Sequence, residues 1–365
     1  MRERNGIIRF ASPALVTGAL VIGGLASPGS DITLNAQTQA STVPPPPATS
    51  ATWNVPRTPH GDPDLQGVWN FATATPLERP GELQGRDRLT DQEAAEFEHE
   101  IRQNVDADRK TALDKGEAGK PVASAARSTA AQLSPELRFA YNNFWYDENR
   151  TKTVETKRTS LVVDPPDGRV PAITEEARAR QAARARTAGR VDGPEDRGIS
   201  ERCIVGFNAG PPMTPSYYNN NVQIFQGPGY VALLNEMIHS VRIVPLDGRP
   251  RLGPRLPQLA GNSRGRWEGN TLVVETTNFS PKSPFRGSTE TMRLVERFTR
   301  VGDTTLLYGF TAEDPATWTR AWSVEFPMRT TGEKVYEYAC HEGNYGMANI
   351  LTAARAEEKA AAKKP

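Results

Sequence analysis

The chain has 365 residues, 37% of them hydrophobic, and its 44 basic and 43 acidic side chains leave a net charge of +1. This balance gives no electrostatic case for nucleic acid as a partner, nor for attraction to anionic lipid. The 30 glycines and 30 prolines favour many turns and irregular connections, and the length suits one elaborated domain of about 250 residues with appendages.

Residues 1–40 have the pattern of a secretory signal peptide. Three arginines within the first nine residues precede a mostly apolar stretch over residues 10–26, and Ala36 and Ala40 offer cleavage sites. The alternative is a membrane anchor, for which an apolar run interrupted by Pro13 and by glycines is marginal. No later run has membrane length, so we expect a soluble periplasmic or extracellular protein with no stable membrane insertion.

Composition divides the rest of the chain into four parts. Residues 41–52 are rich in Ser, Thr and Pro, which is typical of a flexible linker. We expect irregular and helical elaborations with a few strands over 53–200, an antiparallel β core over 201–348, and a surface helix or tail over 349–365. The elaborations are predicted to include helices at 89–104 and 174–186 and strands near 67–71 and 159–163.

The second half has strand-length runs separated by turn signals such as Gly227-Pro-Gly229 and Gly269-Asn270. Because these connections are too short for crossover helices, we expect about eight to ten strands in an antiparallel meander that closes into a barrel. The pattern Gly265-x-Trp267 repeats an earlier Gly-x-Trp and favours a lipocalin-like barrel, so the fold class is mainly β with peripheral helices. The predicted strands are 222–226, 230–235, 238–245, 264–268, 271–277, 292–300, 303–311, 318–326 and 334–340.

Three blocks of sequence carry a resemblance to known proteins: EMIH at 236–239, GRWEGNTLVVETTNF at 265–279 and YEYACHEGNY at 336–345. Together they resemble a large family of uncharacterised secreted bacterial proteins, over roughly residues 53–358. The resemblance implies export and membership of that family. It implies no activity, cofactor or catalytic residue, so the functional interpretation depends on the residues themselves.

Cys203 and Cys340 are the only cysteines. In an exported protein such a pair predicts one disulfide, against the alternative of two buried free thiols. A bridge that closes more than a hundred residues stabilises the fold by about 4 kcal/mol on the loop-entropy account. It would also place Arg202 beside His341 and Glu342.

Two histidines are candidates for acid–base chemistry. If the strand predicted around it continues the preceding one, His239 projects from an apolar interior face, where burial can shift its pKa. The alternative is a structural His239 whose ring bonds a backbone carbonyl. His341 could act as general acid or base with Glu342 as its partner. Asn344 and Tyr345 are candidate substrate contacts, and the alternative is that they cap the loop together with Glu342.

The loop before residue 222 presents Tyr217, Tyr218 and Asn219. Their phenols and amide suit an acid catalyst or the binding of sugar hydroxyls. The alternative for Tyr218 is packing at a rim.

Three arginines could hold a substrate carboxylate or an enolate: Arg202, Arg242 and Arg264. Arg242 is predicted to lie on the strand face opposite His239. Arg264 shares a face with Glu268 by alternation, so the alternative to a carboxylate clamp is a surface ladder of ion pairs.

We expect neither a metal nor a cofactor, because His239 and His341 lack metal-ligand spacing and no phosphate-binding or nucleophile motif occurs. The preferred function is a secreted enzyme, a lyase, hydrolase or isomerase, acting on a small and carbohydrate-like molecule by His/Tyr chemistry. The alternative is a non-catalytic lipocalin-like protein that binds a small molecule. A third is an interaction module of the cell envelope.

Overall fold

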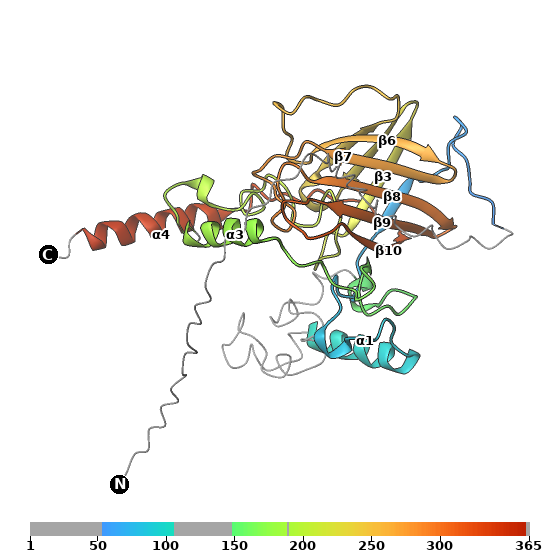
Figure 1. Cartoon of the computed structure of the whole chain (residues 1–365), viewed down its shortest axis with the longest axis horizontal. Helices are drawn as coiled ribbons and strands as arrows, with labels where there is room; N and C mark the ends of the chain where they lie inside the picture. Colours follow the sequence, from blue (N-terminus) through green and yellow to red (C-terminus); the bar gives the residue numbers. More distant parts are fainter. Residues whose placement is uncertain (1–52, 106–147, 188–189, 363–365) are drawn as a thin grey trace, which may run out of the picture. The chain divides into compact units, whose positions relative to one another are not determined.

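The computed structural model describes residues 53–105, 148–187 and 190–362 (Figure 1). The signal peptide predicted for 1–40 and the linker predicted for 41–52 lie outside the described residues. Both stay predictions.

Ten strands form one antiparallel sheet that nearly closes into a barrel, which confirms the predicted fold class (Figure 1). The strands are β1 Gly67–Asn70, β2 Val162–Asp164, β3 Asn221–Gly227, β4 Tyr230–Asn235, β5 Val241–Pro245, β6 Asn262–Glu268, β7 Thr271–Thr277, β8 Arg293–Gly302, β9 Thr305–Glu313 and β10 Trp322–Thr330. Their order is β5-β4-β3-β1-β10-β9-β8-β7-β6, and β2 also pairs with β10. Two meanders, β3 to β5 and β6 to β10, are therefore joined through β1.

The edge strands of this sheet, β5 and β6, face each other across a seam. Gly265 in β6 allows their close approach, because a Cβ there would come within 2.5 Å of Leu246 Cδ2 and 2.8 Å of Val244 Cγ1. A larger residue at position 265 would push the two edges apart. The glycine of the Gly-x-Trp pattern thus has a packing role at the seam.

Helices lie outside the sheet in the described chain: α1 Asp91–Val105, α3 Glu175–Thr187 and α4 Tyr345–Ala361. Short 3-10 turns occur at η1 Gly81–Leu83, η6 Glu148–Thr151, η7 Pro194–Asp196 and η8 Met237–His239. Thr90 and Glu93 form a reciprocal capping box at the start of α1, with N–H to side-chain distances of 3.2 and 2.8 Å. None of the described helices is long and apolar enough to cross a membrane.

Aromatic side chains fill the barrel interior. Alternate residues of the central strands point inward, and Phe298, Tyr308, Phe310 and Trp322 are fully buried. The ring centroids of Phe298 and Tyr308 are 5.0 Å apart, and those of Phe310 and Trp322 are 5.6 Å apart. The interior around these rings is a packed core, whereas a lipocalin holds its ligand there.

The two ends of the barrel differ. At the turn end, hairpins close through two-residue turns at 228–229, 269–270 and 303–304. At the opposite end, the loop end, residues 206–220 enter β3, residues 278–292 join β7 to β8, and residues 314–321 join β9 to β10. Such long connections are where binding side chains are usually found.

One predicted strand begins too early, and another does not form. The strand predicted at 238–245 begins only at β5, because β4 and β5 form a hairpin in which Leu234 pairs with Val241 and the chain turns through η8. The segment 334–340 is not a strand, because β9 occupies one edge of β10 while β1 and β2 occupy the other. Strands β1 and β2 come from residues 53–200, the region predicted to hold irregular and helical elaborations with a few strands.

Candidate functional site

The predicted disulfide is confirmed: Cys203 and Cys340 are bonded, with their Cα atoms 5.7 Å apart and a sequence separation of 137. Asn344 strengthens this junction. Its side chain accepts from Met347 N (3.3 Å) as the N-cap of α4 and donates to the Glu201 carbonyl (2.7 Å). The capping alternative therefore holds for Asn344.

Three other residues predicted near the bridge face solvent. His341 and Glu342 are exposed in the turn that follows the cysteine, and the Tyr345 side chain is 75% exposed. Arg202 forms an ion pair with Glu195 (3.8 Å). The bridge therefore brings these segments together without forming an enclosed acid–base pair, and the roles predicted for His341, Glu342 and Tyr345 stay predictions.

The prediction that His239 faces the barrel interior is wrong. His239 ends η8 at the loop end, and its side chain is exposed. The tight turn instead buries Met237 and Ile238, with positive φ at Ile238 and His239. Burial of two adjacent apolar side chains favours this turn over a continued strand, in which only one of them would face inward.

The loop residue Tyr218 packs at the rim of the barrel, in agreement with the alternative for it. Its ring lies edge-on to Phe207 (6.0 Å) and stacks on Tyr338 (6.3 Å). Both tyrosines pack against a small apolar cluster that contains Met237 and Ile238, and Cys340 joins them. The segments that contain Tyr218, Met237 and Tyr338 thus meet at the loop end. They meet through apolar contacts and not through the predicted acid–base groups. Tyr217 and Asn219 are half-buried in the same loop.

Arg242 points into the barrel, which corrects the face predicted for it. Its guanidinium makes a two-bond ion pair with Glu296, with Nη2 2.9 Å from Oε1. The Tyr308 hydroxyl donates to the same carboxylate (2.9 Å) and accepts from Met213 N (3.1 Å). We call Arg242, Glu296 and Tyr308 the buried triad.

The electrostatics of the buried triad fix its charges. Burial by itself lowers the pKa of Arg242, but the charge and hydrogen bonds of Glu296 raise it above the ordinary value. Burial and then the Glu296 charge raise the pKa of Tyr308 well above its usual range. Arg242 therefore stays cationic and Tyr308 stays protonated. Both side chains bind the Glu296 carboxylate within the core.

Arg264 also has its partners within the chain. It donates to the carbonyls of Arg249 (2.9 Å) and Ser263 (2.6 Å) and to that of Pro250. The predicted ladder of surface ion pairs does exist next to it, where Glu268 accepts from Arg266 and Arg297. Arg264 is not part of that ladder and instead holds the chain that follows β5.

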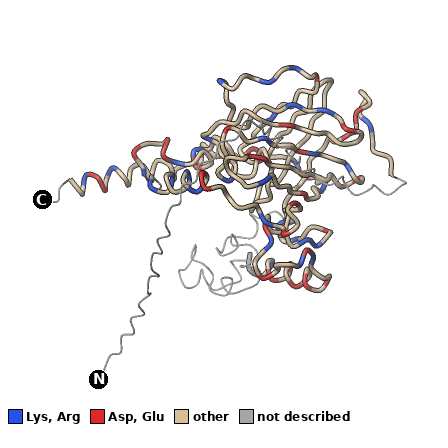
Figure 2. The backbone as a smooth tube through the Cα atoms, in the orientation of Figure 1, with Lys and Arg blue, Asp and Glu red and all other residues tan. Residues whose placement is uncertain are grey.

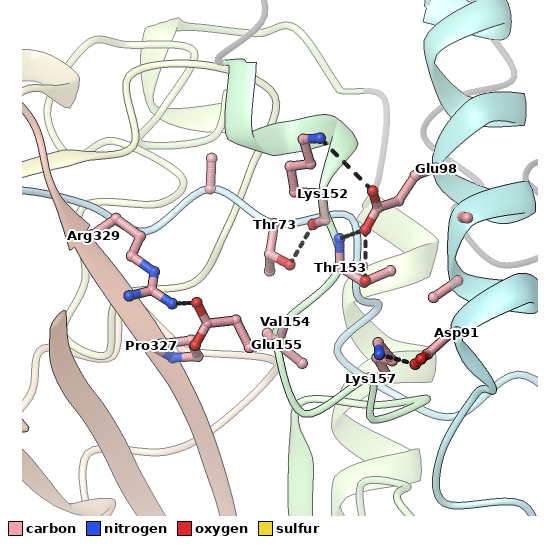
Figure 3. A pocket seen from close by; sticks show the side chains of 13 residues that line it. Thr73, Asp91, Glu98, Lys152, Thr153, Val154, Glu155, Lys157, Pro327 and Arg329 are labelled. Carbon is pink, nitrogen blue, oxygen red and sulfur yellow. Dashed lines mark hydrogen bonds and ion pairs between the residues drawn. The ribbon is translucent and has the colours of Figure 1, made fainter. Parts of the chain in front are cut away.

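One hollow, of about 440 Å³, lies between α1 and the outer face of β10 (Figure 3). Its charges are paired with one another. Lys152 faces Glu98 (3.9 Å), while Lys157 pairs with Asp91 and Arg329 with Glu155 (Figure 3). The Thr153 amide and hydroxyl also bond Glu98, at 2.8 and 2.7 Å. This hollow lies where α1 packs against the barrel. Its charged side chains already form ion pairs with one another.

A second hollow, of about 400 Å³, opens at the loop end, and we call it the loop-end pocket. The segment after β1, the end of the chain leading into β2, and the loops 206–220 and 278–292 form its walls. Leu77, Leu161 and Phe285 provide apolar surface, and Phe285 stacks on Trp322 (6.0 Å, 16°) at the end of the core. The remaining described lining residues are Thr73, Thr75, Pro76, Arg150, Phe207, Thr214, Pro215, Pro284 and Arg286.

The polar lining of the loop-end pocket is cationic. Arg150 is only 4% exposed and donates from Nη1 to the Thr73 carbonyl (2.6 Å). Arg286 is partly exposed and pairs with Glu78 (2.6 Å), which is not among the lining residues. The described lining contains two guanidinium groups and three threonine hydroxyls but no carboxylate, imidazole or thiol. This set can bind an anion and offers no obvious proton acceptor.

A third hollow, of about 380 Å³, shares Phe207, Pro284 and Phe285 with the loop-end pocket. Ser200, Glu201 and Lys282 contribute its polar groups. Two hydrogen bonds lower the pKa of Glu201, so this carboxylate is ionised. The larger effect comes from the backbone amide of Gly198 and the smaller from the side chain of Arg197. The hollow is therefore mixed in charge, in contrast to its neighbour.

No local sequence pattern marks Arg150 or Arg286 as a binding residue. They lie in connecting segments 136 positions apart and meet only through the fold. The connection over residues 278–292 is long, which is typical of a segment that carries binding side chains, but the connection over 246–261 is long as well.

No family model, no curated protein and no solved structure matches this chain. The resemblance to the secreted bacterial family therefore stays a prediction. Among the described residues, no group of three or more His, Cys, Asp or Glu side chains could hold a metal ion.

Proposed function

We propose that this protein binds a small anionic molecule with an apolar body in the loop-end pocket, and that it does so without catalysis. The observation that carries this proposal is the pocket lining, in which Arg150 and Arg286 lie among apolar side chains, while Glu78, the ion-pair partner of Arg286, lies outside the described lining. The site agrees with the second function predicted from the sequence, a binding protein, but lies at the mouth of the barrel.

The chemistry of the lining supports a carboxylate as the anionic group. A charge-assisted hydrogen bond to a guanidinium contributes about 1.5–3 kcal/mol. Leu77, Leu161 and Phe285 add apolar contact worth about 25 cal/mol for each Å² buried. A volume of about 400 Å³ suits a molecule the size of an aromatic or sugar acid.

Binding is favoured over catalysis by the positions of the acid–base groups. His239 and His341 are exposed, and neither is among the described residues that line the three hollows. A general base must come within about 3 Å of the proton that it removes. The predicted export to the periplasm or the extracellular space is compatible with a ligand taken from outside the cytoplasm.

The test is calorimetric binding of charged and neutral ligand pairs. Benzoate, phenylacetate and glucuronate are compared with benzyl alcohol and methyl glucoside. We expect only the acids to bind. The substitution Arg286→Gln should lower the affinity for them at least about tenfold, equivalent to 1.4 kcal/mol. The variant also leaves Glu78 without its cation beside the pocket, which adds repulsion.

The matched control is Arg320→Gln. Arg320 is also partly exposed and also pairs with one carboxylate, that of Asp164 (2.8 Å), but it lies outside the described lining. Its replacement should leave the affinity unchanged. Equal binding of the neutral compounds, or equal loss in both variants, would contradict the proposal.

A further inference from the structure

The connection between β5 and β6, residues 246–261, exposes an unusual amount of apolar surface; we call it the arginine–leucine loop. Within eight positions Leu252, Leu256 and Leu259 are 43%, 59% and 37% exposed. The same side of the seam continues into β5, where Val241 and Ile243 are also exposed. Apolar side chains gathered in this way mark an interaction surface.

The backbone of this loop is held in place, so the exposure of its leucines does not come from a lack of structure. The Gln258 amide donates to Asn278 O (3.0 Å) and the Gln258 carbonyl accepts from Ser280 N (2.8 Å). The Asn278 side chain donates to Leu256 O (2.9 Å), and the Ser283 hydroxyl donates to Leu259 O (2.6 Å). The backbone at Leu256 and Leu259 is thereby held in a conformation that leaves both side chains exposed.

Positive charge is concentrated in the same segment. Residues 246–264 contain four arginines and one aspartate, although the whole chain is nearly neutral. Figure 2 shows the basic positions along this part of the tube. Burial and then the charges of Arg251 and Arg249 lower the pKa of Arg264, as expected where cations crowd. Arg255 is exposed and makes no ion pair with a described residue.

We infer that the arginine–leucine loop docks the protein on an anionic lipid surface. The leucines enter the boundary between headgroups and acyl chains, and the arginines lie over the anionic headgroups. The positive charge matches such a surface. Three leucines on one loop offer far less than the roughly 800 Å² per partner of a stable protein interface, whereas a lipid surface has no fixed shape to match. The inference is independent of the ligand proposed above.

The test is co-sedimentation of the mature protein with vesicles. Vesicles of equal parts phosphatidylglycerol and phosphatidylcholine are compared with vesicles of phosphatidylcholine alone, at low and high salt. We expect binding to the anionic vesicles only, weakened by salt. The triple change Leu252→Ser, Leu256→Ser and Leu259→Ser should lower the partition coefficient at least about tenfold, because binding scales with the buried apolar area.

Charge is tested separately, since a triple variant can fold poorly. Arg255→Glu should weaken binding severalfold, while Lys359→Glu and Ile350→Ser, exposed positions on α4, should leave it unchanged. Binding by the serine variant equal to that of the native protein, equal binding to both vesicle types, or no vesicle binding would each overturn the inference. A dimer that the serine variants dissociate, without vesicle binding, would assign the loop to a second copy instead.

Discussion

The two ends of the barrel are built from the same strands but have opposite characters. The turn end closes with two-residue turns, and its charges, such as the Glu268 pairs, are partly exposed. The loop end carries long connections, the disulfide, the cationic pocket and a set of buried polar groups. Asn70 donates to Asn221 (2.9 Å), which donates to Glu236 (3.0 Å), and all three are buried there. One end of the barrel therefore supports the sheet, while the other is free to carry a site.

The largest expected effect is on the bridge that ties the loop end together. Replacing both Cys203 and Cys340 by serine should lower the unfolding free energy by about 4–5 kcal/mol, because the bridge closes a loop of 137 positions in the folded chain. Urea unfolding of the variant and of the native oxidised protein measures the difference. A loss below about 1 kcal/mol would show that the loop end is held by its packing alone.

The next effect compares a buried with an exposed carboxylate. Glu296→Gln leaves Arg242 charged in the core and should cost about 3–5 kcal/mol. Glu268→Gln, at the turn end, removes the partner of Arg266 and Arg297 at the surface and should cost at most about 1 kcal/mol. Denaturant midpoints of the two variants give the comparison, and similar costs would contradict the distinction between interior and surface.

The phenol of the buried triad predicts a dependence on alkaline pH. Because the pKa of Tyr308 is raised in the folded chain, the folded protein keeps this proton where the unfolded chain has lost it. The contribution is fully present below pH of about 10 and is lost above it, by up to about 1.4 kcal/mol per pH unit. Tyr308→Phe should remove that slope.

The matched variant for this measurement is Tyr230→Phe, whose phenol lies exposed at the turn end. Its unfolding free energy should follow the native pH profile. If Tyr308→Phe keeps the native slope between pH of about 9 and 11, the triad does not hold the proton as described.

The smallest expected effects are at the two histidines. His239→Asn, which suits the positive φ, and His341→Ala should each change the unfolding free energy by less than about 0.5 kcal/mol, because both side chains are exposed. Neither should change the affinity for the acids. Loss of binding, or loss of a turnover found by a substrate screen, would favour the enzyme predicted from the sequence.

Local signals in the sequence predicted much of the sheet. The bounds of β4 and β7 agree with the predicted strands, and a glycine-containing turn precedes each of them. The disulfide was predicted from the pair of cysteines in a chain expected to be exported. The segment 334–340 alternates like a strand, yet it has no edge to join, because the edges of β10 are taken by segments far away in the sequence. The alternation of side chains along one segment cannot show which other segments pair with the same strand edge.

The site was less predictable than the fold. His239 was assigned to the interior on the assumption of an unbroken strand, whereas the burial of Met237 and Ile238 produces a turn. Arg150 and Arg286 converge from separate connections whose course depends on tertiary packing. The reactive residue types in the sequence lie in segments that meet at the loop end of the barrel, but they are not the residues that line the loop-end pocket.

Binding of an acid in the loop-end pocket is tested most directly by a crystal structure of the protein soaked with the acid that binds best in the panel. The account predicts its carboxylate within hydrogen-bond distance of Arg286 or Arg150 and its apolar part against Phe285, in the loop-end pocket. A ligand seated in the crevice beside α1, or a loop-end pocket that stays empty at saturating ligand, would contradict it.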